Sequence, residues 1–356
     1  GEVGSGKTIV AAFALFAAAQ NNVQSVFIAP TQILAHQHYQ NLSPIFEKLH
    51  IPVQLVAGDD KYETTAPNTI YIGTHALFEH AKTIKPAVVV IDEEHRFGVM
   101  QRETFWKAIK KPHVFTMTAT PIPRTVAQTV LADQDVSYLD EIPAKKKQTI
   151  TKVVDEKNRN KAYTWIAHHL DKGAQAFVVC PFIDQSELED LANIKSAEKT
   201  VLSMQKVFPK HRVAMLHGKT PKDQRENILN DMRTGKLDIL VATPIIEVGI
   251  DIPNASIMLI EGAERFGLAQ LHKLRGRVGR AGQVAYCLLF TSEGIETTRR
   301  LRILEKESNG NILAEHDLKL RGTGELLGTR QHGFDTLKFA SWFDEKLINE
   351  CKETVA

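Results

Sequence analysis

Short apolar runs alternate along this chain with segments of helical length, a pattern that predicts parallel sheets covered by helices. The run Ala87–Ile91 contains no polar residue, which is typical of a strand buried on both faces. The expected strands of a first sheet are Ser25–Pro30, Thr69–Thr74, Ala87–Asp92 and His113–Thr118. Those of a second sheet are Ala174–Cys180, Val213–His217, Asp238–Thr243, Ala255–Ile260 and Val284–Thr291. The sequence therefore predicts an α/β fold with two similar units in tandem.

The pattern changes at two places that suggest domain boundaries. After Asp140–Pro143 the chain becomes polar and rich in lysine, as expected of a linker. Beyond Ser292, residues 293–308 and 311–320 read as a hairpin of two helices around an Asn309-Gly310 break. A glycine-rich loop over residues 321–331 follows the hairpin. We therefore expect domains at residues 1–143, 144–291 and 292–356.

Composition places the chain among ordinary globular proteins. It has 356 residues, of which 43% are hydrophobic and 24% charged, a length sufficient for about two domains. No segment approaches the ~20 apolar residues of a membrane span, so no membrane partner is expected. Cys180, Cys287 and Cys351 have spacings that predict neither a disulfide framework nor a zinc site. This favours a reducing compartment, and the expected location is the cytoplasm.

Charge is distributed unevenly between the two halves. Residues 1–140 contain 11 Lys and Arg against 13 Asp and Glu, whereas the remainder contains 33 against 29. The basic second half is a modest indication of a polyanionic partner. The alternative is a solvated surface without a binding role.

The first eight residues fit the phosphate-binding pattern of Gly, four residues, Gly-Lys and then Ser or Thr. Gly1, Gly4 and Gly6 let backbone N–H groups turn toward phosphate oxygens. Lys7 can reach the β- and γ-phosphates, and the Thr8 hydroxyl suits Mg²⁺. The largely apolar helix expected after this loop would be buried, with its N-terminal dipole directed at the phosphates. The alternative is a glycine-rich turn that matches the pattern by chance.

A pair of carboxylates follows the most apolar strand. Asp92 stands where α/β proteins place a carboxylate on the Mg²⁺ side of a phosphate loop. Glu93 beside it could orient and deprotonate an attacking water, which indicates a hydrolase. On its own, a polar stretch after a strand is more often an ordinary loop than a functional site. Its occurrence in one chain with the phosphate loop favours a nucleotide-hydrolysing site.

Arginines and glycines are interleaved between residues 275 and 280. Arg275, Arg277 and Arg280 can present guanidinium groups to phosphate, with Gly276 and Gly279 between them. Supplied from a second domain, such arginines would neutralise charge on the phosphates, and ATP would bridge the two lobes. Solubility alone is the competing explanation.

Six blocks carry a resemblance to a known family. They are Ala29–Ala35, Gly73–Ala76, Asp92–Val99, Met117–Thr125, Ile246–Ala255 and Ala263–Gln270. They resemble the superfamily 2 helicase core, and within it the RecG family of ATP-dependent DNA branch-migration helicases. The resemblance implies two tandem RecA-like parallel-sheet domains plus a helical hairpin and loop, the first domain lacking the strand before its phosphate loop. It implies ATP and Mg²⁺ as cofactors and branched double-stranded DNA as partner, in fork regression and Holliday junction branch migration.

The resemblance also implies roles for individual residues. Arg277 and Arg280 would be the arginine fingers, and Asp251 would lie near the ribose. The residues implied in DNA contact or in coupling the lobes are Pro30, Thr31, Thr74, His75, His95, Thr118, Thr120 and Thr243. At the end of the chain, Arg321, Arg330 and Gln331 would hold a loop that converts lobe closure into movement on DNA.

Three positions depart from the RecG pattern, namely Glu94, Pro244 and Lys273, and Glu94 resembles the Mfd family of transcription-repair coupling factors. Residues 132–143 and 327–331 favour RecG. An Mfd-like translocase with RNA polymerase as partner and a non-hydrolysing nucleic-acid clamp stay open as alternatives. The wedge domain that RecG-like enzymes use to recognise junctions is not among these 356 residues. The sequence does not decide whether single-strand-binding protein is a partner.

Overall fold

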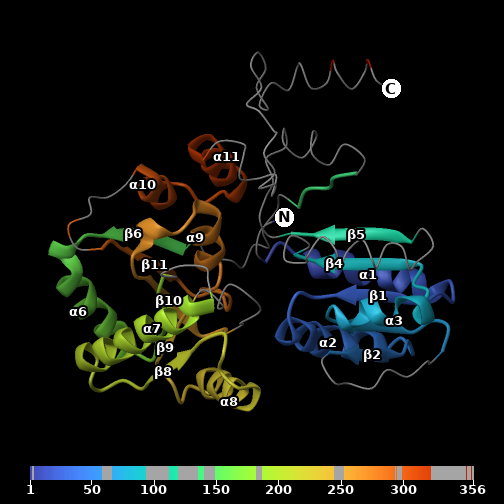
Figure 1. The fold of residues 1–356 in the computed structure, drawn as a ribbon, viewed down its shortest axis with the longest axis horizontal. Helices are drawn as coiled ribbons and strands as arrows, with labels where there is room; N and C mark the ends of the chain where they lie inside the picture. The colour runs from blue at the N-terminus through green and yellow to red at the C-terminus, as the bar shows by residue number, and fades with distance from the viewer. Residues whose placement is uncertain are drawn as a thin grey trace. The chain divides into compact units, whose positions relative to one another are not determined.

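The computed structural model describes residues 1, 4–57, 66–93, 112–118, 135–139, 149–181, 187–243, 252–292, 294, 299–321, 350 and 354. The chain folds into two compact units, each built around one parallel sheet (Figure 1). The first unit contains strands β1 to β5. The second contains strands β6 to β11 and the two helices α10 and α11 that follow them.

The first sheet has the strand order β2-β3-β1-β4-β5, with every described pair parallel. Its strands are β1 (Ser25–Ile28), β2 (Val53–Val56), β3 (Ile70–Gly73), β4 (Val88–Asp92) and β5 (His113–Met117). Its helices are α1 (Lys7–Gln20), α2 (Gln32–Glu47) and α3 (Ala76–Ile84). The crossovers from β1 to β2 and from β3 to β4 are thus made by α2 and α3.

Alternation along the strands explains how both faces of this sheet are covered. Val88 and Val90 of β4 join a core cluster with side chains of α1 and α2. Val89 and Ile91, which point to the opposite face, join a second cluster with side chains of α3. The uninterrupted apolar run therefore reflects burial on both faces, as predicted.

The second sheet has the order β6-β11-β10-β7-β9-β8 and is also parallel in every described pair. Its strands are β6 (Thr149–Val154), β7 (Gln175–Val179), β8 (Val213–Leu216), β9 (Ile239–Ala242), β10 (Ala255–Ile260) and β11 (Ala285–Phe290). Its helices are α6 (Arg159–Leu170), α7 (Glu187–Val207), α8 (Lys222–Arg233) and α9 (Leu268–Arg275), with short 3₁₀ turns at Glu156–Asn158 and Ala263–Arg265. Side chains of α6 and α7 form one core cluster with this sheet.

Helices α10 (Arg299–Lys306) and α11 (Gly310–Arg321) pack on each other and on α9. The break between them is a helix cap, because the Asn309 carboxamide oxygen accepts hydrogen bonds from the backbone N–H groups of Asn311 and Ile312. The predicted pair of helices is confirmed, but the first helix, expected over residues 293–308, is Arg299–Lys306, with residue 294 in a turn, and the second begins one residue earlier than expected.

The fold class and all nine expected strands are confirmed, with ends that differ by one or two residues. Two strands were missed. Polar residues interrupt both strands, Gln54 in β2 and Thr151 and Lys152 in β6, so neither shows the apolar run used to recognise strands. The expected burial of the first helix is wrong in part, because Ile9, Val10 and Phe13 of α1 are 62%, 51% and 72% exposed. Only the face of α1 that contains Leu15 lies against the sheet.

Candidate nucleotide and nucleic-acid site

The carboxyl ends of the first sheet bring most of the sequence-predicted residues of the first unit to one edge. Pro30 and Thr31 follow β1, Thr74 and His75 follow β3, Asp92 and Glu93 stand at the end of β4, and Thr118 follows β5. Parallel strands all end at the same edge, so segments far apart in sequence become neighbours there. This is the edge at which open α/β sheets bind ligands.

The phosphate loop has the geometry that its glycines predict. Gly4 and Gly6 have φ of 82° and 92°, values that favour glycine. A Cβ atom at Gly1 would lie 2.7 Å from the Ser5 hydroxyl oxygen and 2.8 Å from Cβ of Leu139, so no side chain fits there. Lys7 donates from Nζ to the Gly1 carbonyl oxygen at 2.7 Å. The loop thus closes on itself at the N-terminus of α1.

A buried hydroxyl in this loop shows that it fits an anion. The Ser5 hydroxyl oxygen is buried and has no hydrogen-bond partner within the described part of the chain. A buried polar atom without a partner costs about 1–3 kcal/mol. A phosphate oxygen bound in the loop would supply an acceptor for this hydroxyl at the end of a helix whose dipole favours negative charge.

Asp92 points toward the face of the sheet that α1 and α2 cover. It follows Val88 and Val90 at intervals of two residues, and those side chains belong to the core cluster on that face. One carboxylate oxygen, Oδ2, lies 3.2 Å from Nε2 of His38 on α2. The other oxygen, Oδ1, is thereby left for a different ligand.

Glu93 leaves the strand through a strained turn. Its φ is 52°, in the left-handed region that a non-glycine residue seldom occupies, at a cost of about 1–3 kcal/mol. Its backbone N–H donates to the Met117 carbonyl of β5 at 2.8 Å, which fixes the turn. Such strain is concentrated at functional sites.

The donors in this unit fit Mg²⁺. This ion takes oxygen ligands and is usually held by one or two protein groups together with phosphate oxygens and water. The Asp92 carboxylate and the Thr8 hydroxyl are such groups, and Thr8 stands in the first turn of α1, beside the phosphate loop. Within the described residues there is no cluster of three or more metal-ligating side chains, so a site of that composition depends on the nucleotide for further ligands.

The residues expected to contact DNA in this unit lie at a topological switch point. Strands β1 and β3 are neighbours, but the helices that follow them, α2 and α3, pack on opposite faces of the sheet. Thr31 caps α2 by accepting from the Leu34 N–H at 3.4 Å. Thr74 is buried, and its hydroxyl oxygen lies 3.5 Å from the N–H of Ala76. Both hydroxyls therefore order the loops at this point, which is where α/β sheets bind ligands.

In the second unit, two of the three arginines flank a required glycine. Gly279 has φ of 77°, and a Cβ there would lie 2.7 Å from Cβ of Ala285. Arg277 and Arg280 stand on either side of it and are half-buried. Thr243, expected to contact DNA, is buried directly after β9, and Lys273 is buried in α9.

The third arginine has a structural role instead. Arg275 is 6% exposed and donates to the carbonyl oxygens of Leu304, Glu307 and Ser308 at 3.0, 2.7 and 3.1 Å. These carbonyls lie at the C-terminal end of α10, where backbone acceptors lack helical partners and a cation is favoured. At the other end of α9, the N–H of Leu268 donates to the Asp317 carboxylate of α11. Helix α9 is therefore bound to the hairpin at both ends.

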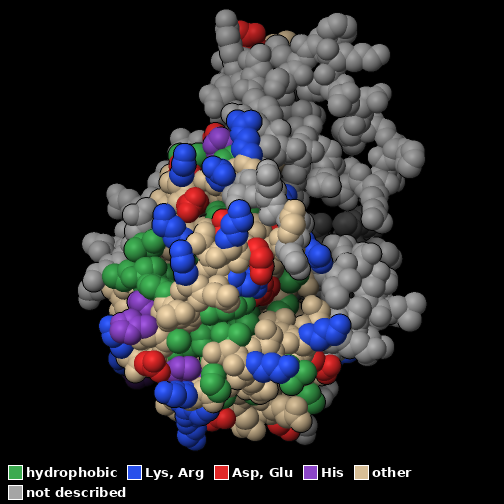
Figure 2. Space-filling view, turned by 90° about the vertical axis from the view of Figure 1, so that its left-hand side faces the viewer, with side chains coloured by type: hydrophobic (Ala, Val, Ile, Leu, Met, Phe, Trp, Pro, Cys, Tyr) green, Lys and Arg blue, Asp and Glu red, His purple; other side chains and the backbone are tan. Residues whose placement is uncertain are grey.

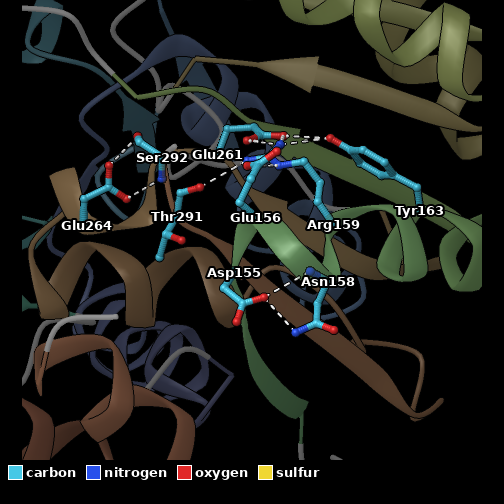
Figure 3. Close-up of polar contacts among 9 residues, drawn as sticks. All are labelled: Asp155, Glu156, Asn158, Arg159, Tyr163, Glu261, Glu264, Thr291 and Ser292. Atoms are coloured by element: carbon cyan, nitrogen blue, oxygen red, sulfur yellow. Dashed lines mark hydrogen bonds and ion pairs between the residues drawn. The ribbon is translucent and has the colours of Figure 1, made fainter. Parts of the chain in front are cut away.

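A partly buried ion pair holds the segment between β10 and α9 (Figure 3). Arg159, the first residue of α6, donates from one terminal nitrogen to both carboxylate oxygens of Glu261 at 2.9 Å. Its other terminal nitrogen donates to the Thr291 carbonyl at 3.2 Å, and its guanidinium lies 4.7 Å from the centre of the Phe290 ring. Burial raises the pKa of Glu261, and Arg159 opposes that rise.

The same segment is anchored a second time, three residues later. The Glu264 carboxylate accepts from the hydroxyl and the N–H of Ser292 at 2.5 and 3.3 Å, as Figure 3 also shows. The Glu264 carbonyl accepts from the Arg300 guanidinium of α10. The residues leading into α9 are thus fixed by β11 and α10 before the arginine segment begins.

Several predictions lie outside the described residues: His95, Thr120, Asp251, Arg330 and Gln331, together with the departures Glu94 and Pro244. Arg321 is the last residue of α11.

The face of the second unit seen in Figure 2 shows Lys and Arg scattered among acidic and neutral side chains. In the described part of the chain, no helix is long and apolar enough to cross a membrane.

Comparison with known proteins shows which proteins the chain is similar to. A family model described as DEAD/DEAH box helicase matches residues 1–129, and one described as helicase conserved C-terminal domain matches residues 157–282. The ATP-dependent DNA helicase RecG of Synechocystis is 42% identical over 371 residues, covering 100% of this chain and 44% of that protein. The RecG of Streptococcus pneumoniae is 40% identical and covers 100% and 54%. Over its whole length, the chain is therefore similar to RecG helicases.

A solved structure of RecG bound to a three-way DNA junction supports this similarity at the level of the fold. It superimposes with a TM-score of 0.77 and 36% identity, covering 100% of this chain and 46% of that one. The resemblance of the sequence to RecG and the tandem parallel-sheet architecture are thereby confirmed. The chain spans about half the length of the RecG proteins it matches.

Sequence reasoning missed two features of this RecG-like core. The partners Arg159 and Glu261 are 102 residues apart in the sequence, and no local sequence pattern indicates such a pair. His38 had a recognisable signal, because it lies among Ala35, Leu42 and Phe46 at helical spacing on the buried face of α2. A histidine in an apolar stripe indicates a buried polar partner.

Proposed function

We propose that the protein is an ATP-dependent translocase that moves on double-stranded DNA and acts on branched substrates. The observation that carries the proposal is the convergence of the phosphate loop, Asp92 and Glu93 in one unit of a chain that matches RecG helicases over its whole length. Fork regression and Holliday junction branch migration are the proposed reactions. An Mfd-like role is disfavoured, because the relatives described above are RecG proteins.

In the proposed reaction, each group at the edge of the first sheet has one task. The loop amides and Lys7 bind the phosphates, and Glu93 orients the attacking water and accepts its proton. Thr8 and Asp92 would hold Mg²⁺, which neutralises charge on the phosphate oxygens when bound. Asp251 is proposed to lie near the ribose.

In the proposal, the second unit supplies arginines for the phosphoryl group, and both units supply hydroxyls for the DNA backbone. Arg277 and Arg280 are proposed to neutralise the charge that develops on the transferred phosphoryl group, and Thr118 and Thr120 to relay nucleotide state between the sheets. A translocase has to grip phosphates without reading bases, for which hydroxyls and backbone amides suffice. The residues proposed for that contact are Pro30, Thr31, Thr74, His75, His95 and Thr243. Arg321, Arg330 and Gln331 are proposed to couple lobe closure to movement.

The proposal is tested by ATP hydrolysis with and without a synthetic three-way DNA junction. Lys7→Ala should lose nucleotide binding, whereas Glu93→Gln should bind the nucleotide and fail to turn it over. The removal of a proton acceptor costs about 10²–10⁴-fold in rate. A Glu93→Gln protein with the wild-type rate would refute the assignment of the base, and hydrolysis that no DNA stimulates would refute a DNA translocase.

A further inference from the structure

Helix α2 carries a histidine at a position where an apolar side chain is expected. Ala35, His38, Leu42 and Phe46 are separated by three or four residues and are all buried, so they share the face that lies on the sheet. His38 is only 8% exposed. A polar ring in such a place is unfavourable unless it is hydrogen-bonded.

The hydrogen bond that His38 makes leads to the candidate magnesium ligand. Its Nε2 lies 3.2 Å from Oδ2 of Asp92, and a carboxylate can only accept, so Nε2 carries the hydrogen and donates. The ring lies against Phe27 of β1, with 4.5 Å between the ring centres. Its Nδ1 is buried and has no partner in the described part of the chain. Within that part, Asp92 is thus the group that satisfies the imidazole.

This contact sets which oxygen of Asp92 is presented to a ligand. The carboxylate ends β4, and rotation about its side-chain bonds would otherwise let either oxygen face the phosphate loop. The bond to His38 holds Oδ2 toward α2 and leaves Oδ1 on the other side. Groups that hydrogen-bond to metal-ligating carboxylates orient them in this way.

We propose that His38 is a positioning residue, whose Nε2–H fixes the Asp92 carboxylate in the orientation that binds the magnesium ion of Mg–ATP. The inference rests on the proposed function, because Asp92 holds the ion only if the first unit binds Mg–nucleotide. The competing explanation is that His38 merely fills the space between α2 and β1.

The two explanations predict different results in a nucleotide-binding experiment. A space-filling role affects thermal stability alone. A positioning role affects the response of nucleotide affinity to Mg²⁺ and leaves the affinity for metal-free nucleotide unchanged, because the phosphate loop is intact. The measurement is an equilibrium titration of the protein with a fluorescent ATP analogue, made in EDTA and then across a series of Mg²⁺ concentrations at constant ionic strength.

Three variants separate the hydrogen bond from the packing. His38→Phe keeps a ring beside Phe27 and removes the donor. His38→Gln keeps a donor, since the glutamine amide nitrogen reaches the place of Nε2. His50→Asn is the matched control, because His50 is exposed just beyond α2 and its φ of 56° suits asparagine. Thermal unfolding followed by circular dichroism verifies that each variant folds.

We expect His38→Phe to need about 10-fold more Mg²⁺ for half-maximal effect, a loss typical when a metal ligand loses its hydrogen-bonded partner. His38→Gln and His50→Asn should resemble the wild type, and all four proteins should bind the metal-free analogue equally. If His38→Phe does not fold, His38→Asn replaces it, because the shorter amide cannot reach Oδ2.

Two results would overturn the inference. A folded donor-less variant with the wild-type response to Mg²⁺ would leave the proposed function standing and remove the role of His38. If the nucleotide affinity of the wild-type protein did not change with Mg²⁺ concentration, both the proposed magnesium site and the inference would be refuted. These failures are distinguishable, because the second appears in the wild type.

Discussion

Replacing Arg159 by methionine should destabilise the second unit, because its partner Glu261 would lose the cation that it pairs with. Arg159 is held by two contacts to Glu261, one to the Thr291 carbonyl, one to Tyr163 and one to the exposed Glu156 carboxylate. Methionine fills a similar volume beside Phe290 but donates no hydrogen bond. Glu261 would then stay buried as a carboxylate without its cation.

The magnitude follows from the burial of the pair. Breaking a fully buried ion pair from one side costs about 3–5 kcal/mol. The side chains of Arg159 and Glu261 are 21% and 18% exposed, so solvent offsets part of this cost and we expect about 2–3 kcal/mol. Glu261→Gln should cost about 1–2 kcal/mol, because the amide oxygen still accepts from Arg159. The double variant should lose about 1 kcal/mol less than the sum of the two single changes.

The loss should also depend on pH. Burial raises the pKa of Glu261, and Arg159 lowers it, so removal of Arg159 lets that pKa rise further. A carboxyl whose folded pKa exceeds its unfolded pKa takes up its proton more readily in the folded state, so falling pH favours folding. The deficit of Arg159→Met relative to wild type should therefore shrink as the pH falls from 7 toward the pKa of folded Glu261.

Urea unfolding followed by tryptophan fluorescence measures this locally. The sequence has 3 tryptophans, and Trp106→Phe with Trp342→Phe leaves Trp165 as the single reporter. Trp165 lies on α6 against His169 and Tyr286, so it reports on the second unit, even if the two units unfold separately. Arg212→Met is the control, because Arg212 also pairs with a carboxylate but is exposed. If Arg159→Met and Arg212→Met had the same urea midpoint of unfolding, the reasoning would be refuted.

Two further predictions concern backbone and thiol chemistry in the same unit. Gly279→Ala should lower stability by about 1–3 kcal/mol, measured by the same unfolding assay, because φ is 77° and the new Cβ meets Ala285 at 2.7 Å; an unchanged midpoint would contradict this. Burial raises the pKa of Cys180 to about 11 and of Cys287 to about 12, so neither should react with a thiol reagent at pH 8 until urea unfolds the chain, as peptide mass spectrometry would show.

The sequence could predict those parts of the molecule that depend on short-range pattern. The apolar run of β4 specified a strand with two buried faces, and its last residue, Asp92, was thereby placed at the ligand-binding edge. The phosphate loop was recognisable because glycine spacing determines its backbone. Edge strand β6 was not, since only Thr151 and Val154 of its 6 residues are buried.

Contacts between distant segments were beyond that kind of reasoning. Three arginines in one segment look alike in sequence, yet Arg275 is buried against α10 while Arg277 and Arg280 flank a turn. Only tertiary packing distinguishes them. The His38–Asp92 contact joins residues 54 apart and needs the register of α2 on β4, which no local spacing supplies.

The attachment of α9 to the hairpin sets different tolerances for sequence drift at its two ends. Arg275 binds α10 through the main-chain carbonyls of residues 304, 307 and 308, so these contacts constrain where α10 ends, while the Leu304 side chain itself is buried in the core. Asp317 acts through its own carboxylate, so that position has to retain an acceptor. A hairpin grafted from another helicase would therefore have to end its first helix at the same place, retain an acceptor at position 317 and keep the apolar side chains buried at 301 and 304.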